Sequence, residues 1–291
     1  MSTRIPTYSI CNFFGIENCT KDFMACSLST FLNHHATLVM PHRHSFYQLM
    51  YVSAGSGKYT VDFKTYDAQP GQLFFLSPGQ IHSWNFNADA DGFIINFDES
   101  FFTAVCYNPY FLNEFPFFNS MTQRSTTMAK EEIKPTILSL FAHIKQEHES
   151  DGDFKNDYLR ALLLQLLVVL ARACQPEKQT EATKYNYTLL RNFEKLIEGH
   201  FKSKKLPKEY AELLFITPNH LNAVVASVTG KSSGEIIRDR ILLEAKRMLV
   251  NSGQTISEIA WDLNFEDNAY FSRFFKKYTG VSPDEFRKQQ S

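Results

Sequence analysis

Residues 36–97 alternate between short apolar runs and turn sequences, with no helical period between them. The runs are rich in aromatic and β-branched residues, and breaks such as Gln69-Pro70-Gly71 separate them. Runs of this composition and spacing favour β-strands. Several such strands in succession predict a β-sandwich or barrel in this part of the chain.

Further along, the pattern changes to a helical period. In residues 130–149 apolar positions recur at three and four residues, which predicts a helix with one apolar side. Residues 157–174 are apolar on nearly every side, so this helix must be buried in a core or between subunits. We expect the segment to mediate dimerisation, with Leu163 and Leu167 in the contact. The polar residues 175–185 predict a linker.

The C-terminal part contains a duplicated pattern. Residues 206–236 and 255–286 each read as a helix, a tight turn and a second helix that ends at Thr-Gly. The copies are offset by 49 residues before the turn and by 50 after it. Each second helix starts after an N-cap residue and ends before a C-cap glycine. These capping residues are Thr217 and Asp267 at the starts, and Gly230 and Gly280 at the ends.

The two copies predict tandem helix-turn-helix units at about residues 206–230 and 255–280. A helix over residues 236–251 would join them rigidly. An ordinary helical bundle would show the same local pattern. The duplication and the matched turns favour DNA binding instead.

The second recognition helix has one aromatic side, whose Phe271, Phe274, Phe275 and Tyr278 we expect in the core. The opposite side is small and basic. Small residues allow close approach to the major groove, an arginine can bind guanine through two N–H groups, and a lysine can pair with phosphate. A merely solvated face is the alternative. The residues predicted to contact DNA here are Asn268, Ala269, Ser272, Arg273, Lys276 and Lys277.

The first recognition helix carries no Lys or Arg at its outward positions. An asparagine there can read adenine through its amide, or the helix can dock mainly by shape. The residues predicted to contact DNA are Asn219, His220, Asn222, Ala223 and Ser227.

Residues 256–287 resemble the signature of AraC/XylS-type transcription regulators, through Ile-Ser-Glu-Ile-Ala and the later Tyr-Phe-Ser-Arg-Phe-Phe-Lys-Lys-Tyr-Thr-Gly-Val-Ser-Pro. The resemblance spans about a hundred residues, including both copies and the joining helix. It implies that the two recognition helices enter successive major grooves on one face of DNA. Asn222-Ala223 stands where the family often has Ser-Arg, so base reading by an arginine is not expected there.

A second constellation lies among the predicted strands. His42-Arg43-His44 and Gln48, with the later His82, resemble the two short motifs of the cupin barrel, the sensor domain of many regulators in this family. His42 and His44 alternate along one strand, so both imidazoles face the same side, which suits a metal. Gln48 holds the place of the acidic ligand of metal cupins, so we predict no metal and no cofactor.

Three roles for these histidines stay open: metal ligands, effector-binding groups, or structural side chains bonded to the backbone. The sequence favours a small-molecule pocket without identifying its ligand. The predicted effector-binding residues are His42, His44, Gln48 and His82, with Tyr51 and Trp84 as apolar wall.

These patterns predict an α+β chain: a cupin-like β-barrel over residues 1–128, a helical dimerisation segment and linker over 129–184, and an all-α DNA-binding domain over 185–291. The last segment holds 16 Lys and Arg against 13 Asp and Glu, although the whole chain has a net charge of −1. The five Cys are widely spaced and form no CxxC pair, which is typical of a reducing compartment. With no signal peptide or membrane-spanning run, we expect a cytoplasmic protein.

The predicted function is sequence-specific transcription regulation, controlled by a small-molecule effector in the barrel, without enzymatic activity. The expected partners are double-stranded promoter DNA, the effector and a second copy of the chain. RNA polymerase is a further candidate, and no membrane is expected. One alternative is a cupin-type metalloenzyme with a helical appendage, which Gln48 disfavours. The other is a constitutive DNA-binding protein whose barrel only dimerises.

Overall fold

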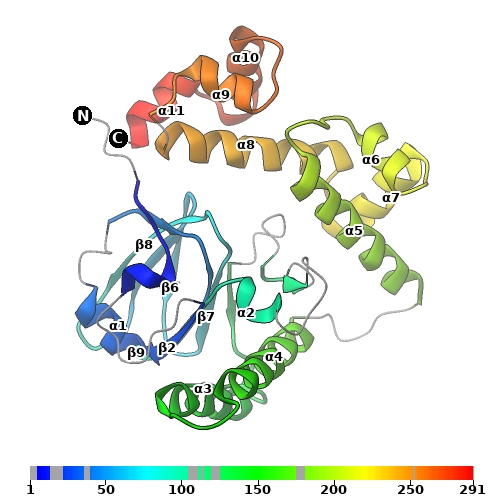
Figure 1. The fold of residues 1–291 in the computed structure, drawn as a ribbon. Coiled ribbons are helices and arrows are strands. Elements are labelled where there is room, and N and C mark those ends of the chain that lie inside the picture. Colours follow the sequence, from blue (N-terminus) through cyan, green and yellow to red (C-terminus); the bar gives the residue numbers. More distant parts are fainter. Residues whose placement is uncertain are drawn as a thin grey trace. The chain divides into compact units, whose positions relative to one another are not determined.

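The computed structural model describes residues 5–13, 22–35, 40–103, 111–112, 115–118, 125–174, 181–251 and 253–290. The chain forms two compact units, one over residues 6–175 and one that comprises residues 176–291 and the first five residues. The first unit is rich in strands and the second is helical (Figure 1). The predicted α+β class, with a sheet-rich N-terminal part before the helix-turn-helix units, is confirmed.

Two five-stranded sheets build the first unit, in the orders β1-β3-β8-β5-β6 and β10-β7-β4-β9-β2. The strands predicted within residues 36–97 are present from His42 onward, residues 36–39 lie outside the described residues, and the structure adds β1 and β2 before them and β10 after them. The strands are β1 (Thr7–Tyr8), β2 (Phe23–Ser27), β3 (His42–His44), β4 (Tyr47–Ala54), β5 (Gly57–Val61), β6 (Lys64–Ala68), β7 (Gln72–Leu76), β8 (Ile81–Phe86), β9 (Asp91–Phe97) and β10 (Thr126–Met128).

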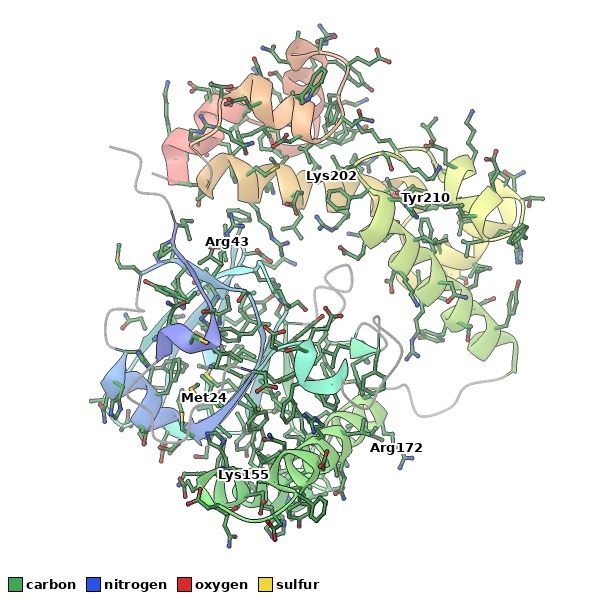
Figure 2. All side chains as sticks on the ribbon, viewed as in Figure 1. Met24, Arg43, Lys155, Arg172, Lys202 and Tyr210 are labelled. Atoms are coloured by element: carbon green, nitrogen blue, oxygen red, sulfur yellow. The ribbon has the colours of Figure 1, made fainter. Side chains whose placement is uncertain are left out.

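Side chains that alternate along the strands of the second sheet pack into two different hydrophobic cores. Met50 and Val52 of β4 point between the sheets, in the core that also contains Met24 (Figure 2). Leu49 and Tyr51 point the other way, where helices α3 (Lys134–Glu149) and α4 (Lys155–Ala173) cover the sheet. This alternation is the normal consequence of strand geometry. The unit also contains a 3₁₀ turn, η1 (Ile10–Phe13), and the short helices α1 (Leu28–His34) and α2 (Ser100–Thr103).

Helix α4 is buried by the barrel itself. Leu163 and Leu167 are fully buried in the core shared by the second sheet, α3 and α4. They are therefore not available for a subunit contact, which corrects the expectation that they lie between subunits. The exposed side of α4 carries Tyr158, Ala161 and Gln165, beside an open groove of about 630 Å³ between α3 and α4.

The helical unit contains both predicted helix-turn-helix units. Each turn places a residue at positive φ, Phe215 at 56° and Asn264 at 54°, and the same pair of backbone hydrogen bonds closes each turn. Of the predicted linker at residues 175–185, residues 175–180 lie outside the described residues, and residues 181–185 are helical, because a helix begins at Glu181. The helices are α5 (Glu181–His200), α6 (Pro207–Leu213), α7 (Pro218–Thr229), α8 (Ser233–Asn251), α9 (Ile256–Asp262), α10 (Asn268–Thr279) and α11 (Pro283–Gln290).

The caps of the recognition helices α7 and α10 are those that the sequence predicts. The Thr217 hydroxyl accepts from the backbone N–H of His220, and the Asp267 carboxylate accepts from that of Tyr270. Gly230 and Gly280 end the helices in the left-handed conformation, at φ 73° and 85°. Local chemistry therefore fixes where both recognition helices begin and end.

Candidate functional site

The outward face of α10 is polar and basic. Phe271 and Phe275 are fully buried, and they hold the helix against the rest of the unit. Phe274 is half-buried and Tyr278 is 41% exposed, so the predicted aromatic core face is narrower than expected. Tyr278 stacks instead on the Arg238 guanidinium of α8, 4.2 Å from the ring centre. Among the residues predicted to contact DNA, Ser272 is half-buried and Asn268, Ala269, Arg273, Lys276 and Lys277 are exposed.

The predicted DNA-contacting positions of α7 are also exposed, but several are engaged within the protein. The Asn222 amide oxygen accepts from the backbone N–H and the hydroxyl of Ser233, at 3.0 and 3.2 Å. His220 lies 3.4 Å from the Tyr185 hydroxyl of α5. The contact face of α7 is therefore less free for base reading than that of α10. The exposed positions are Asn219, His220, Asn222, Ala223 and Ser227.

Lys205 connects the two helix-turn-helix units, a role that sequence reasoning missed. It precedes α6, yet its ammonium lies 3.6 Å from the ring centre of Phe265 and donates to the carbonyl of Asn264, both in the turn before α10. Burial lowers the pKa of Lys205 to about 8. No local sequence signal marks this contact, because Asn264 lies 59 residues away in the sequence and Phe265 follows it.

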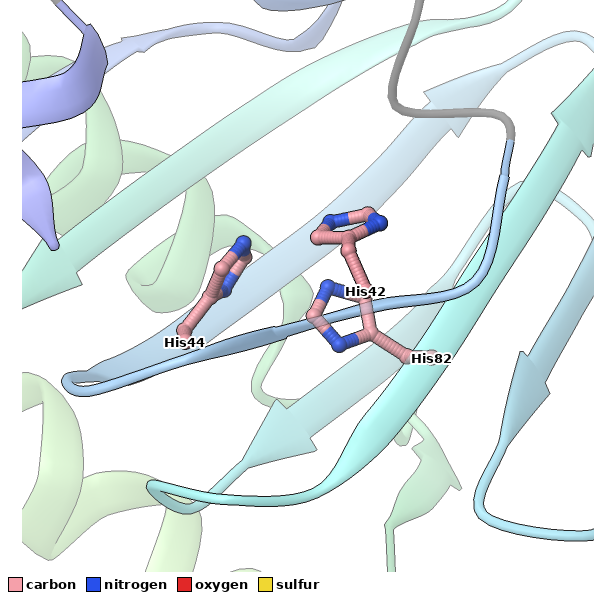
Figure 3. Close-up of side chains that lie close together, drawn as sticks. All are labelled: His42, His44 and His82. Atoms are coloured by element: carbon pink, nitrogen blue, oxygen red, sulfur yellow. The ribbon is translucent and has the colours of Figure 1, made fainter. Parts of the chain in front are cut away.

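In the barrel, three histidines meet between neighbouring strands (Figure 3). His42 and His44 are on β3, and His42 is directly opposite His82 of β8. The ring centres are 4.1 Å apart for His42 and His82, 4.3 Å for His44 and His82, and 5.0 Å for His42 and His44. All three side chains are buried. Their Nδ1 or Nε2 atoms lie within 4.8 Å of one another.

Burial keeps the three imidazoles neutral. It lowers the pKa of His42 to about 4, and it holds the pKa values of His44 and His82 well below the ordinary value. Nδ1–H of His42 donates to the carbonyl of Met40 at 2.8 Å. That of His82 donates to the carbonyl of Gln80 at 3.4 Å. Both Nε2 atoms consequently carry a lone pair.

Trp84 borders this cluster directly, whereas Gln48 is connected to it through Tyr59, whose ring centre is 5.9 Å from that of His82. The Trp84 ring meets His42 edge-on at 5.1 Å. Gln48 is fully buried; its amide oxygen accepts from the Tyr59 hydroxyl at 3.1 Å and its amide nitrogen donates to Asn96 at 3.0 Å. Both residues belong, as predicted, to the barrel interior.

Tyr51 does not join the histidines. It is on the opposite face of β4 and packs against Phe141 of α3, with ring centres 5.9 Å apart. Its placement in the effector pocket was wrong because side chains alternate along a strand, and Tyr51 is of the opposite parity to Gln48.

Two protein families match this chain. The model of an AraC-like ligand binding domain matches residues 28–167, and the model of a helix-turn-helix domain matches residues 210–289. The chain belongs to the AraC-type transcription regulators. As a regulator of this family, it combines a ligand-binding domain with helix-turn-helix units that bind DNA.

The match between this AraC-type regulator and its relatives covers most of the length of each relative. The arabinose operon regulatory protein of Salmonella typhimurium is 24% identical over 242 residues, which are 80% of each chain. The HTH-type transcriptional activator RhaR of Mannheimia succiniciproducens is 20% identical over 259 residues, 85% of this chain and 87% of that protein. Among solved structures, ToxT from Vibrio cholerae O395 is 12% identical, covers 94% of this chain and 99% of its own, and has a TM-score of 0.44.

The arabinose operon regulatory protein and RhaR are both transcription regulators. Among the residues that the structure describes, no helix is both long enough and apolar enough to cross a membrane.

Proposed function

We propose that this regulator reads promoter DNA mainly through α10, with α7 in the adjacent major groove. The exposed basic face of α10 carries the proposal: Arg273 and Lys276 stand opposite the buried Phe271 and Phe275. Arg273 would bind a base, and Lys276 would bind phosphate. α7, which has no Lys or Arg, would dock through the small side chains of its outward face and through Asn219.

The barrel would bind the effector at His42, His44, His82, Gln48 and Trp84. The support is that all five side chains are buried, with polar nitrogens among aromatic rings. A ligand bound there regulates DNA binding only through its different affinities for two states of the protein. The chain would act in the cytoplasm, where promoter DNA lies, and without catalysis.

The regulator would act as a homodimer through the exposed side of α4. Tyr158 and Leu164 are 52% and 37% exposed there, although large apolar side chains favour burial. A homodimer is also consistent with DNA sites made of two half-sites. Contact with RNA polymerase stays a prediction, with no residue assigned to it.

Single substitutions on α10 test the DNA-binding proposal. On a site selected from genomic fragments, Arg273→Ala should cost about 1–3 kcal/mol and relax the preference at one base pair. Lys276→Ala should weaken binding to all sequences alike and reduce the slope of log affinity against log salt by about one. Gel-shift titrations at several salt concentrations measure both effects.

Lys64→Ala is the matched control, because it removes an exposed positive charge from β6 in the barrel unit, outside the proposed subunit contact on α4. It should leave both affinity and salt slope unchanged. If both α10 variants bound DNA as the wild type does, the proposal that this helix enters the major groove would be wrong.

A further inference from the structure

Three nitrogen ligands converge inside the barrel, although no carboxylate is part of their group. His42, His44 and His82 bring their donor atoms within 4.8 Å of one another. Among the described residues, theirs is the group of three or more His, Cys, Asp or Glu side chains that is close enough to hold one metal ion. Exposed acidic groups are common without a bound ion, but these three side chains are imidazoles and all are buried.

Two of these histidines each have one ring nitrogen bound to the backbone. Nδ1–H of His42 and of His82 is bound to a backbone carbonyl, the arrangement that fixes the tautomer of metal-ligating histidines. Within the described part of the chain, the buried Nε2 atoms of both residues find no hydrogen-bond partner. A buried polar atom left without a partner destabilises the fold, so such atoms call for an explanation.

We propose that His42, His44 and His82 bind one divalent transition-metal ion of the class that prefers imidazole ligands, such as Zn²⁺, Ni²⁺ or Fe²⁺. Bonds of about 2.1 Å place the nitrogens of a tetrahedral site roughly 3.4 Å apart. The nitrogens, now within 4.8 Å of one another, therefore need to approach by up to about 1.4 Å, a movement within reach of small side-chain rotations. The ion would bond to the Nε2 atoms of His42 and His82.

The surroundings also indicate what completes the coordination of this ion. Gln48 stands where an acidic ligand would be expected, but its amide already bonds to Tyr59 and Asn96. Three neutral imidazoles leave the charge of the ion uncompensated in an aromatic interior, which is unfavourable. The open position therefore takes an anionic oxygen ligand, either hydroxide or the carboxylate of a small molecule. This step deepens the effector site and rests on the proposed function; binding of the ion does not.

Metal titration of the purified full-length chain, stripped with a chelator, tests the ion directly. Co²⁺ added to the stripped chain should saturate at one equivalent and give the visible absorption bands of a nitrogen-ligated ion. Added acetate should shift these bands, because it enters the open position. The variants His82→Gln and His42→Gln should each weaken Co²⁺ binding on the order of 100-fold, since they remove a ligand. His143→Ala, which removes an exposed histidine of α3, is the matched control and should bind like the wild type.

The spectrum of Cu²⁺ bound to the wild type supplies a test that needs no variant. Electron paramagnetic resonance should show coupling to imidazole nitrogens. Absence of saturable Co²⁺ binding, or equal binding by the wild type and a folded His82→Gln chain, would overturn the proposal. DNA binding is measured separately on the stripped chain, so a failure of the metal site and a failure of DNA recognition give different results.

Discussion

Asn222 lies on the outward face of α7, yet its amide oxygen is used within the protein. It accepts both the backbone N–H and the hydroxyl of Ser233 at the start of α8. The side chain thus joins the first recognition helix to the helix that connects the two units. An amide with this task cannot at the same time offer the same oxygen to a base. We therefore expect Asn222 to contribute to stability more than to sequence reading.

Asn222→Ala should lower the free energy of unfolding by about 1 kcal/mol, the usual contribution of a hydrogen bond at a helix start. Asn222→Asp should retain most of the stability, because it keeps the acceptor oxygen. Asn219→Ala, which changes an exposed residue of the same helix, is the control for loss of an amide. Urea unfolding of the full chain provides the comparison. Equal stability of the two alanine variants would show that the Ser233 contact contributes nothing.

His148 makes the barrel unit sensitive to acid. Its ring is buried against that of Phe23, with ring centres 5.5 Å apart. Burial, and to a smaller extent the positive charge of the nearby Lys155, lowers the pKa of His148 to about 4. The unfolded chain has the ordinary value of about 6.5 and so binds more protons between pH 6.5 and 4. Stability is therefore lost as the pH falls through this window.

His148→Phe should reduce the loss of stability between pH 6.5 and 4, because it removes a group that must be buried without charge. The three barrel histidines keep part of the pH dependence. Urea midpoints measured across this range give the result, with His143→Ala as the control on the same helix. If the stability of the His148→Phe chain depended on pH as steeply as that of the wild type, His148 would not be a source of the acid sensitivity.

At the scale of elements, the sequence predicts what local chemistry fixes. The capping residues Thr217 and Asp267 and the glycines Gly230 and Gly280 act within one turn, so the recognition helices are predicted closely. The covering of α4 depends on packing between distant elements. Its apolar residues indicate burial on several sides, but not whether a barrel or a second subunit provides it.

The error at Tyr51 has a local cause. Gln48 and Tyr51 are three positions apart on β4, so their side chains point to opposite faces of the sheet. Tyr51 therefore joins the core beneath α3 and α4, away from the histidines. Gln48 and Trp84 did reach the barrel interior, as their positions in the sequence suggest.

Leu164→Glu tests the proposed subunit contact on α4. Leu164 is 37% exposed, whereas its neighbour Leu163 is fully buried. We expect Leu164→Glu to give folded monomers, because it places a charge in the contact without entering the core. Leu163→Glu should instead yield unfolded or insoluble chain, since it buries an unpaired charge. Sedimentation with near-ultraviolet circular dichroism separates the outcomes, and a folded Leu164→Glu dimer would exclude this face.

At the scale of the whole molecule, regulation requires that the barrel and the helical unit share two states. Coupling of about 1–3 kcal/mol, typical of such proteins, would change DNA affinity roughly 5- to 150-fold. The sequence establishes the two parts and their chemistry, because each part has its own motifs. It does not identify the effector or the DNA site, since neither is encoded in any local pattern.

Selection of binding sites from fragmented genomic DNA by the purified full-length chain is the direct test of sequence-specific DNA binding by two recognition helices. We expect enrichment of a discrete set of sites, each with two sequence elements whose centres lie about 10 base pairs apart, one helical turn. The Arg273→Ala chain should relax the preference at one base pair, in only one of the two elements. Recovery of no sequence above the input DNA by the folded wild-type chain would contradict sequence-specific binding.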